Sequence, residues 1–178
     1  MAGGGYITSV WRKNSAGEWR VLADVGISAR LTDSTALVEP ARFARKTKAV
    51  ADTAASRRAL LAAEQAFAAL ALESPRLAYQ RSLSASPGTR LYRNRKPPTV
   101  DATARAFAEQ QVDKTEYTVA KAVVAASGDL GFTYGYGNCH KRSGPFIRIW
   151  RNTGGQQWKI VHEVLDLNYD FTAEAKSR

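Results

Sequence analysis

The sequence predicts an α+β fold in which helices cover one face of a curved antiparallel sheet. Residues 53–83 and 99–111 are rich in strong helix formers, whereas residues 115–167 are rich in β-branched and aromatic residues divided by turn signals. A run of helices followed by a run of strands is typical of helices packed on one face of an antiparallel sheet.

The composition allows a stable domain without covalent or metal crosslinks. The chain has 178 residues, of which 44% are hydrophobic, and this length supports a sizeable core. Cys139 is the single cysteine and has no partner for an internal disulfide. No run reaches the ~18 apolar residues of a membrane helix, and the first residues lack a signal-peptide pattern. The cytoplasm is therefore the default location, and a secreted or periplasmic one stays open if a signal was removed.

The first expected element is a β-hairpin over residues 6–25, because two strand-like runs flank the turn sequence KNSAGE. We assign residues 1–27 to this hairpin. Residues 28–52 lose the alternation and are expected to form a basic linker. Its basic cluster consists of Arg42, Arg45, Lys46 and Lys48.

A long helix is expected next, because residues 53–73 contain strong helix formers throughout. Leu60, Phe67 and Leu70 lie near one face of it, and the helical spacing is taken to place Glu64 nearer another.

Three shorter elements separate this helix from the main sheet. Ser74 and Pro75 are an N-cap and first-turn pair, which predicts a second helix. A short strand is expected at residues 89–94. A third helix follows, with Thr99 or Asp101 as its N-cap.

The main sheet is expected from residues 115–126, residues 130–138 and a closing hairpin at residues 145–167. The sequences SGDLG and CHKRSG supply the turns between these strands. The element order from residue 53 is therefore α, α, β, α, β, β, β, β.

The segment SGDLGFTYGYG, followed by GPFIRIWRNTGGQQWKIVHEVLD, resembles the second half of the nuclear transport factor 2-like superfamily, in its SnoaL-like and uncharacterised bacterial branches. The resemblance covers roughly residues 53–167, and the helical half matches by element order and by LLAAEQAF. It implies a cone-shaped domain at residues 53–168, a tail at residues 169–178, an enclosed cavity and a homodimer formed through the sheet. The superfamily contains isomerases, cyclases, dehydratases and non-catalytic association domains, so the fold leaves the function open.

Residues 6–25 repeat the closing hairpin without gaps, 139 positions earlier in the chain. We interpret residues 1–27 as the end of a preceding, mostly missing copy of the domain, a tandem repeat remnant. The alternative is two unrelated hairpins that share common strand residues. An isolated hairpin is marginal in water, so this one is expected to add to a sheet edge in its own domain or in a partner. The matched pairs are Trp11 and Trp150, Arg12 and Arg151, Trp19 and Trp158, and Val25 and Val164.

The closing hairpin also supplies the predicted binding site. If its turn sets Trp150 opposite Trp158, alternation places Arg148 and His162 diagonally on the same aromatic face. The first copy has Ser9 and Ala23 at the two corresponding positions. The predicted ligand-binding residues are Arg148, His162, Trp150, Trp158, Tyr134, Tyr136 and Phe146.

Aromatic walls with a few convergent polar groups are typical of a small-molecule site. Arg148 would bind a carboxylate or enolate oxygen, and His162 is the candidate for proton transfer. In the competing interpretation Arg148 reaches solvent across Trp150, and His162 is a satisfied core residue. We therefore expect binding of a small apolar or anionic molecule without evident catalysis. The alternatives are a non-catalytic association domain, whose cavity its own side chains fill, and a superfamily isomerase, cyclase or dehydratase.

Other chemistries find little support. Cys139 beside His140 cannot fill a four-ligand zinc site without carboxylates, and GYG at residues 135–137 lacks the later glycine of a dinucleotide fingerprint. We expect neither metal nor cofactor. The net charge is +10, and Tyr92 lies within the basic stretch RLYRNRKPP, but such a loop is more often solvated than bound to nucleic acid. The expected partners are a second copy of the chain and a small-molecule ligand, with neither nucleic acid nor membrane.

Overall fold

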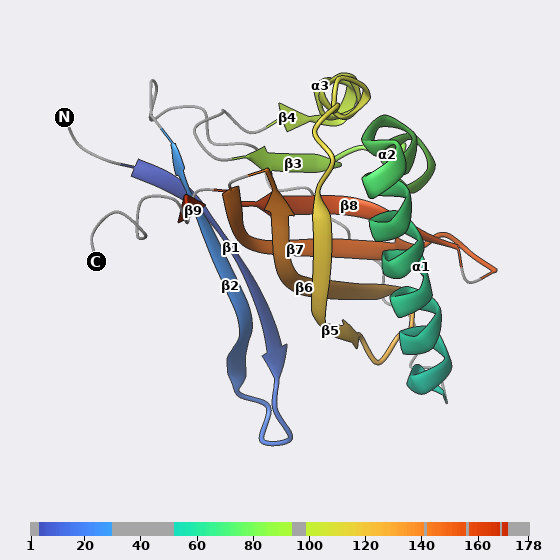
Figure 1. Cartoon of the computed structure of the whole chain (residues 1–178). Coiled ribbons are helices and arrows are strands. Elements are labelled where there is room, and N and C mark those ends of the chain that lie inside the picture. The colour runs from blue at the N-terminus through green and yellow to red at the C-terminus, as the bar shows by residue number, and fades with distance from the viewer. Residues whose placement is uncertain are drawn as a thin grey trace.

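The structure, a computed structural model, describes residues 4–29, 52–93, 99–140, 142–155, 157–167 and 169–170. Its helices and strands follow the order shown in Figure 1, and they confirm the predicted α+β class. Most of the predicted linker, residues 30–51, lies outside the described residues. Among the described helices, none combines the length and the apolar character that crossing a membrane requires.

The larger sheet has the strand order β4-β3-β8-β7-β6-β5. β3 runs parallel to β8, and the other neighbours in this order are antiparallel. β9 pairs with the start of β7, so two residues of the predicted tail form a strand. The bounds are β3 (Arg90–Arg93), β4 (Thr99–Val100), β5 (Glu116–Val124), β6 (Leu130–Cys139), β7 (Arg142–Asn152), β8 (Trp158–Leu165) and β9 (Tyr169–Asp170).

The first two helices are found where the sequence predicts them. α1 spans Thr53–Glu73. Asp52 is its N-cap, and the Asp52 side chain accepts hydrogen bonds from the backbone N–H groups of the first turn. α2 spans Pro75–Ser82. Ser74 is at its N-cap position, as predicted, although the Ser74 side chain makes no capping hydrogen bond.

The third helix, α3 (Asp101–Glu109), is capped differently from the prediction. Thr99 is not the cap, because it forms β4 with Val100. Asp101 is not the cap either, because its carboxylate accepts a hydrogen bond of 2.5 Å from the backbone N–H of Gly88. Instead, the Thr103 hydroxyl accepts a 3.0 Å hydrogen bond from the backbone N–H of Val100.

α1 lies across one face of the larger sheet, which we call the helix side; the opposite face is the outer side (Figure 1). The core fills the space on the helix side because the apolar residues of α1 meet alternate residues of β7 and β8. Its largest members are Leu60, Phe67, Tyr79, Leu91, Trp150, Trp158 and Ile160.

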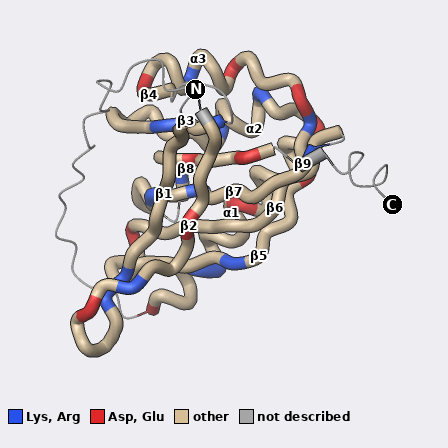
Figure 2. The backbone as a smooth tube through the Cα atoms, turned by 90° about the vertical axis from the view of Figure 1, so that its left-hand side faces the viewer, with Lys and Arg blue, Asp and Glu red and all other residues tan. Residues whose placement is uncertain are grey.

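The N-terminal hairpin, β1 (Gly4–Lys13) and β2 (Trp19–Ala29), forms a separate two-stranded sheet. The expectation that it adds to a sheet edge of its own domain is therefore wrong. Instead it packs on the outer side of the larger sheet, as Figure 2 shows from the hairpin's side. The ring of Tyr6 lies 5.7 Å from that of Tyr92, and Ile27 packs against Val164.

The two hairpins have the same strand register. Each carries one β-bulge, in which Leu22 is the extra residue of β2 and Val161 that of β8. Every pair of partners from Ile7 with Gly26 to Lys13 with Trp19 recurs 139 positions later. The pairs beside the bulge are Val10 with Ala23 and Trp11 with Val21 in the first hairpin, and Ile149 with His162 and Trp150 with Ile160 in the second.

The correspondence extends to both ends of the hairpins. A Cβ atom on Gly144 would lie 1.4 Å from the carbonyl oxygen of Asp166, and one on Gly5 would lie 2.3 Å from that of Ile27. These two close approaches are again 139 positions apart. The turns share a hydrogen bond as well, from Asn14 N to Glu18 O and from Thr153 N to Gln157 O, each 2.8 Å long.

Gly144→Ala should destabilise the domain, because the added methyl group meets a backbone atom that cannot move aside. We expect the free energy of unfolding to fall by about 1–3 kcal/mol, as in other overpacked sites. Gly26→Ala is the control, since its Cβ would lie at an ordinary 3.6 Å from Ile7. Urea unfolding followed by circular dichroism measures both, and equal midpoints would contradict the close approach.

Candidate functional site

Two charged residues of the closing hairpin face the helix side with no access to solvent. Arg148 in β7 pairs across the sheet with Glu163 in β8, and both are 0% exposed. The bulge at Val161 decides this arrangement. One extra residue in β8 shifts the alternation and turns Glu163 toward the helices.

The Arg148 guanidinium is enclosed by carboxylates and aromatic rings. Its Nε donates to Glu163 and its Nη1 donates to Glu64 of α1. Its Cζ lies over three aromatic rings, so the cation is also stabilised by the negative faces of these rings. The distances to the ring centroids are 4.2 Å for Phe67, 4.0 Å for Tyr117 and 4.4 Å for Phe146.

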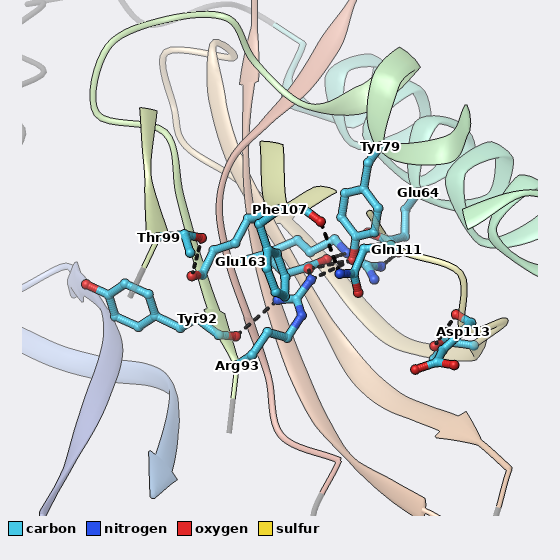
Figure 3. Close-up of polar contacts among 12 residues, drawn as sticks. Glu64, Tyr79, Tyr92, Arg93, Thr99, Phe107, Gln111, Asp113 and Glu163 are labelled. Carbon is cyan, nitrogen blue, oxygen red and sulfur yellow. Dashed lines mark hydrogen bonds and ion pairs between the residues drawn. The ribbon is translucent and has the colours of Figure 1, made fainter. Parts of the chain in front are cut away.

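Glu163 joins this cluster to β3 and α2. The Tyr79 hydroxyl donates a 2.7 Å hydrogen bond to its Oε1, and Arg93 Nη2 donates to the same oxygen. Arg93 Nη2 also lies 2.7 Å from the Tyr79 hydroxyl oxygen, to which it donates. Figure 3 shows Tyr79, Arg93 and Glu163 converging on one point between the helices and the sheet.

Glu64 completes the cluster from the opposite side. It is 0% exposed and accepts a 2.6 Å hydrogen bond from the Thr133 hydroxyl, which in turn accepts one of 3.0 Å from Trp150 Nε1. Two guanidiniums therefore balance two carboxylates inside the core, and we call Glu64, Tyr79, Arg93, Thr133, Arg148 and Glu163 the buried network.

The network shifts the pKa values of Glu163 and Tyr79 away from neutral pH. Burial alone would raise the pKa of Glu163, but the attraction of Arg93 and Arg148 outweighs it and lowers that pKa to about 2. Burial raises the pKa of Tyr79 well above its ordinary value. Both shifts lead away from neutral pH, so Glu163 stays a carboxylate and Tyr79 stays a phenol there.

The prediction that His162 shares a face with Arg148 is wrong. Because of the bulge, Trp150 lies opposite Ile160 rather than Trp158, and His162 lies on the outer side. There its Nε2 is 2.9 Å from the Thr8 hydroxyl of the hairpin. Burial, followed by the charge of Arg90, lowers the pKa of His162 to about 4.

Tyr134 and Tyr136 also differ from the prediction. Tyr134 lies opposite Ile147 on the outer side and stacks on Phe132 with a centroid distance of 6.2 Å. Tyr136 is 61% exposed. Neither phenol points into the space that holds Arg148. Of the predicted ligand-binding residues, the helix side holds Phe146, Arg148, Trp150 and Trp158.

Most of the buried network was not predicted from the sequence. Glu64 was assigned to another face of α1, yet it stands four residues after Leu60 and three before Phe67, the spacing of a shared helical face. That spacing was the available signal. The facing of Glu163 depends on a bulge that the strand pattern does not reveal, and Arg93 and Tyr79 reach the network only through the tertiary fold.

Cys139 and His140, the neighbouring pair in the sequence, lie in different surroundings. Cys139 is buried, and His140 is exposed with its nearest acid, Asp113, 3.8 Å away. No group of three or more His, Cys, Asp or Glu within the described ranges is placed to hold a metal ion. In the basic stretch, Tyr92 packs against the hairpin and Arg93 joins the buried network, so neither is presented to nucleic acid.

No family model and no curated protein matches the sequence. Solved structures do share its fold. A ketosteroid isomerase-like protein from Erwinia carotovora atroseptica SCRI1043 is 12% identical, with a TM-score of 0.54, over 64% of this chain and 97% of that one. A cystatin-like fold protein from Burkholderia xenovorans LB400 is 19% identical, with a TM-score of 0.53, over 64% and 92%.

A third structure, a nuclear transport factor 2-like protein of unknown function from Shewanella oneidensis MR-1, is 13% identical with a TM-score of 0.50. It aligns with 61% of this chain and 97% of its own length. At these identities the likeness concerns the fold alone. The chain thus has the nuclear transport factor 2-like fold, and we call the space between its helices and its curved sheet the cone interior.

Glu163→Gln should destabilise the domain strongly, because it leaves Arg93 and Arg148 without a shared counter-ion. Breaking a buried ion pair typically costs about 3–5 kcal/mol. Urea unfolding at pH 7 measures the loss. Glu109→Gln, an exposed carboxylate at the end of α3, is the control. A loss as small as that of the control would show that the network is not formed.

The same carboxylate makes stability depend on acid. Its pKa falls from 4.5 to about 2 on folding, so its contribution is fully present above pH 4.5 and is lost as pH falls toward 2. The parent should lose stability across this window more steeply than Glu163→Gln. Parallel pH curves for the two proteins would contradict the lowered pKa.

His162 should make hairpin docking sensitive to pH. It resists protonation down to about pH 4 in the folded chain, against an ordinary pKa of 6.5. Protonation therefore favours states that expose the ring, and docking should weaken as pH falls from 6.5 toward 4. The groups around the ring are Thr8, Arg90, Tyr92 and Glu163. NMR signals of Tyr6 and Ile27 report docking. His162→Gln should remove the pH dependence of docking between pH 6.5 and 4. A variant whose docking still weakens over this range would refute the role of His162.

Proposed function

We propose that this chain is a non-catalytic association domain. The observation that carries the proposal is the buried network: Arg148, the residue best suited to bind an anionic ligand, has two carboxylates of its own chain as counter-ions. Three aromatic rings cover the same guanidinium. These contacts already occupy the Arg148 guanidinium, so a ligand in the cone interior would have to displace fixed ion pairs.

One observation favours small-molecule binding as the second candidate. Arg148 Nη2 is buried and has no hydrogen-bond partner among the described residues, and an unpaired donor inside a protein is costly. A small anion that reached it would supply the missing acceptor. An isomerase, cyclase or dehydratase would need a group with a near-neutral pKa beside a Tyr or His in the cone interior. In the buried network, the pKa shifts of Glu163 and Tyr79 lead away from neutral pH, which speaks against such a role for these two groups.

The N-terminal hairpin supplies the surface for association. One face of β1 and β2 packs on the outer side of the sheet, and the other, which we call the outward face, is open to solvent. Exposed apolar patches mark interaction sites in soluble proteins, and tryptophan is enriched at their centres. The outward face presents Ile7, Trp11, Trp19 and Val21, with exposed fractions of 70%, 52%, 61% and 48%.

The repeat interpretation supports the same proposal. Equal register, an equal bulge and equally placed close approaches are what two copies of one closing hairpin would have. A closing hairpin of a preceding copy would present the face that the rest of that copy covers. In the isolated chain we expect this face to bind a second copy of itself, which gives a homodimer.

Native mass spectrometry of the full-length chain tests the proposal. We expect no small-molecule adduct, and a dimer with a dissociation constant of about micromolar order, as for small interfaces. Trp11→Glu with Trp19→Glu should yield a monomer whose circular dichroism is unchanged. The control places the same charges at two exposed leucines in α1 and β6, Leu72→Glu with Leu130→Glu, and should remain dimeric.

Two outcomes would contradict this function. A stoichiometric adduct that disappears in a folded Arg148→Met variant would favour the ligand-binding alternative. A dimer that survives the double tryptophan substitution would place association on another surface.

A further inference from the structure

We infer that the outward face of β1 and β2 is the closing wall of a second cone, and that its partner is an α+β half-domain of the kind that residues 53–142 form here. The inference rests on the proposed function, because it concerns the same surface: a second copy of the chain binds this face when the half-domain is absent, and the half-domain takes its place when it is present. It follows from comparing what each hairpin does with the same side of its strands.

The exposed residues of the first hairpin correspond to core residues of the second. Ile7, Trp11, Trp19 and Val21 stand 139 positions before Phe146, Trp150, Trp158 and Ile160. The exposed fractions of the second set are 0%, 0%, 4% and 0%. The outward face is therefore the side that, in the complete domain, packs against α1 and the rest of the core.

The shape of the outward face also matches its counterpart. A bulge sets the local twist of a hairpin, and the two bulges occupy the same place. A helix and sheet that pack on β7 and β8 would therefore meet the same surface on β1 and β2. Such a half-domain differs from a second copy of this chain, whose own half-domain is already closed by its β7 and β8.

The docking of the hairpin keeps this face available. Tyr6, Thr8 and Ile27 hold the opposite face against Tyr92, His162 and Val164. A partner on the outward face would thus complete a second cone that lies back to back with the first one. The hairpin is the shared layer between them.

Two substitutions define the charge of the partner. Ser9 stands where the complete domain has Arg148, and Asp24 where it has Glu163; the Ser9 hydroxyl donates a 3.0 Å hydrogen bond to Asp24. Without a guanidinium in the wall, a carboxylate at the position of Glu64 would be buried without a counter-ion. Asp24 still needs a cation. The partner therefore carries an uncharged residue at the position of Glu64 and keeps an arginine at that of Arg93.

A fusion to the full chain tests this inference. A second copy of residues 53–142 is joined directly to Gly4, because Gly4 stands 139 positions before Ser143. One version keeps the natural glutamate in the added segment, and the other carries Glu64→Leu there. The added segment contains no tryptophan, so acrylamide quenching of fluorescence reports on the four natural tryptophans of the chain.

We expect the Glu64→Leu version to fold onto the hairpin. Its added amides should exchange at least about a hundredfold more slowly than in an unfolded chain, and Trp11 and Trp19 should lose their access to acrylamide. The version with natural glutamate should be less protected. Trp11→Glu with Trp19→Glu should abolish protection of the added segment while leaving residues 53–167 of the parent chain protected.

Failure of this inference can be distinguished from failure of the proposed function. If both versions leave the added segment unprotected and both tryptophans quenchable, the half-domain is not the partner. A dimer of the unfused chain that the tryptophan substitutions dissociate would still uphold the association function. Greater protection with natural glutamate than with leucine would overturn the charge assignment.

Discussion

The pairing of Arg148 with Glu163 inside the sheet is the interaction on which the rest of the domain depends. A guanidinium without water costs several kcal/mol unless opposite charge and hydrogen bonds surround it, so every neighbouring element must contribute. α1 brings Glu64, β3 brings Arg93, and α2 brings the Tyr79 hydroxyl. A shift of α1 or β3 would leave a buried charge without one of its partners, and a shift of α2 would remove a hydrogen bond from Glu163. The network therefore fixes where α1 and α2 lie on the sheet as well as what the cone interior can accommodate.

The features that could be predicted are the helices and strands, which depend on interactions between residues close together in the sequence. Helix formers and a proline in the first turn located α1 and α2, and β-branched runs located the strands, because these signals act within a few residues. The site was less predictable. Alternation assigns faces only while a strand stays regular, and the bulge at Val161 moved Glu163 inward and His162 outward. Phe146, Arg148 and Trp150 lie in β7, which has no extra residue, and Trp158 precedes the bulge in β8. These four residues therefore lie on the predicted side.

Comparing the two hairpins separates the architecture that they share from the contacts that each one makes. Positions alike in both hairpins maintain the turn, the register and the close glycine approach. One charged position differs: Ser9 matches Arg148, whereas Asp24 keeps the carboxylate of Glu163. The buried guanidinium is therefore not required to make a hairpin of this shape. It belongs to the surroundings that the second hairpin meets.

This difference also accounts for why the two hairpins do not exchange places. If β1 and β2 closed the complete domain, Ser9 would leave Glu64 buried without its cation. If β7 and β8 closed a half-domain lacking that glutamate, Arg148 would lose one of its two counter-ions. Each exchange would bury an unpaired charge, whereas the observed closure by β7 and β8 sets two guanidiniums against two carboxylates. A buried ion pair adds little net stability, but it makes the penalty for a wrong partner large. The buried network thus selects the wall that carries Arg148 to close the cone, and the wall that has Ser9 at this position stays on the surface.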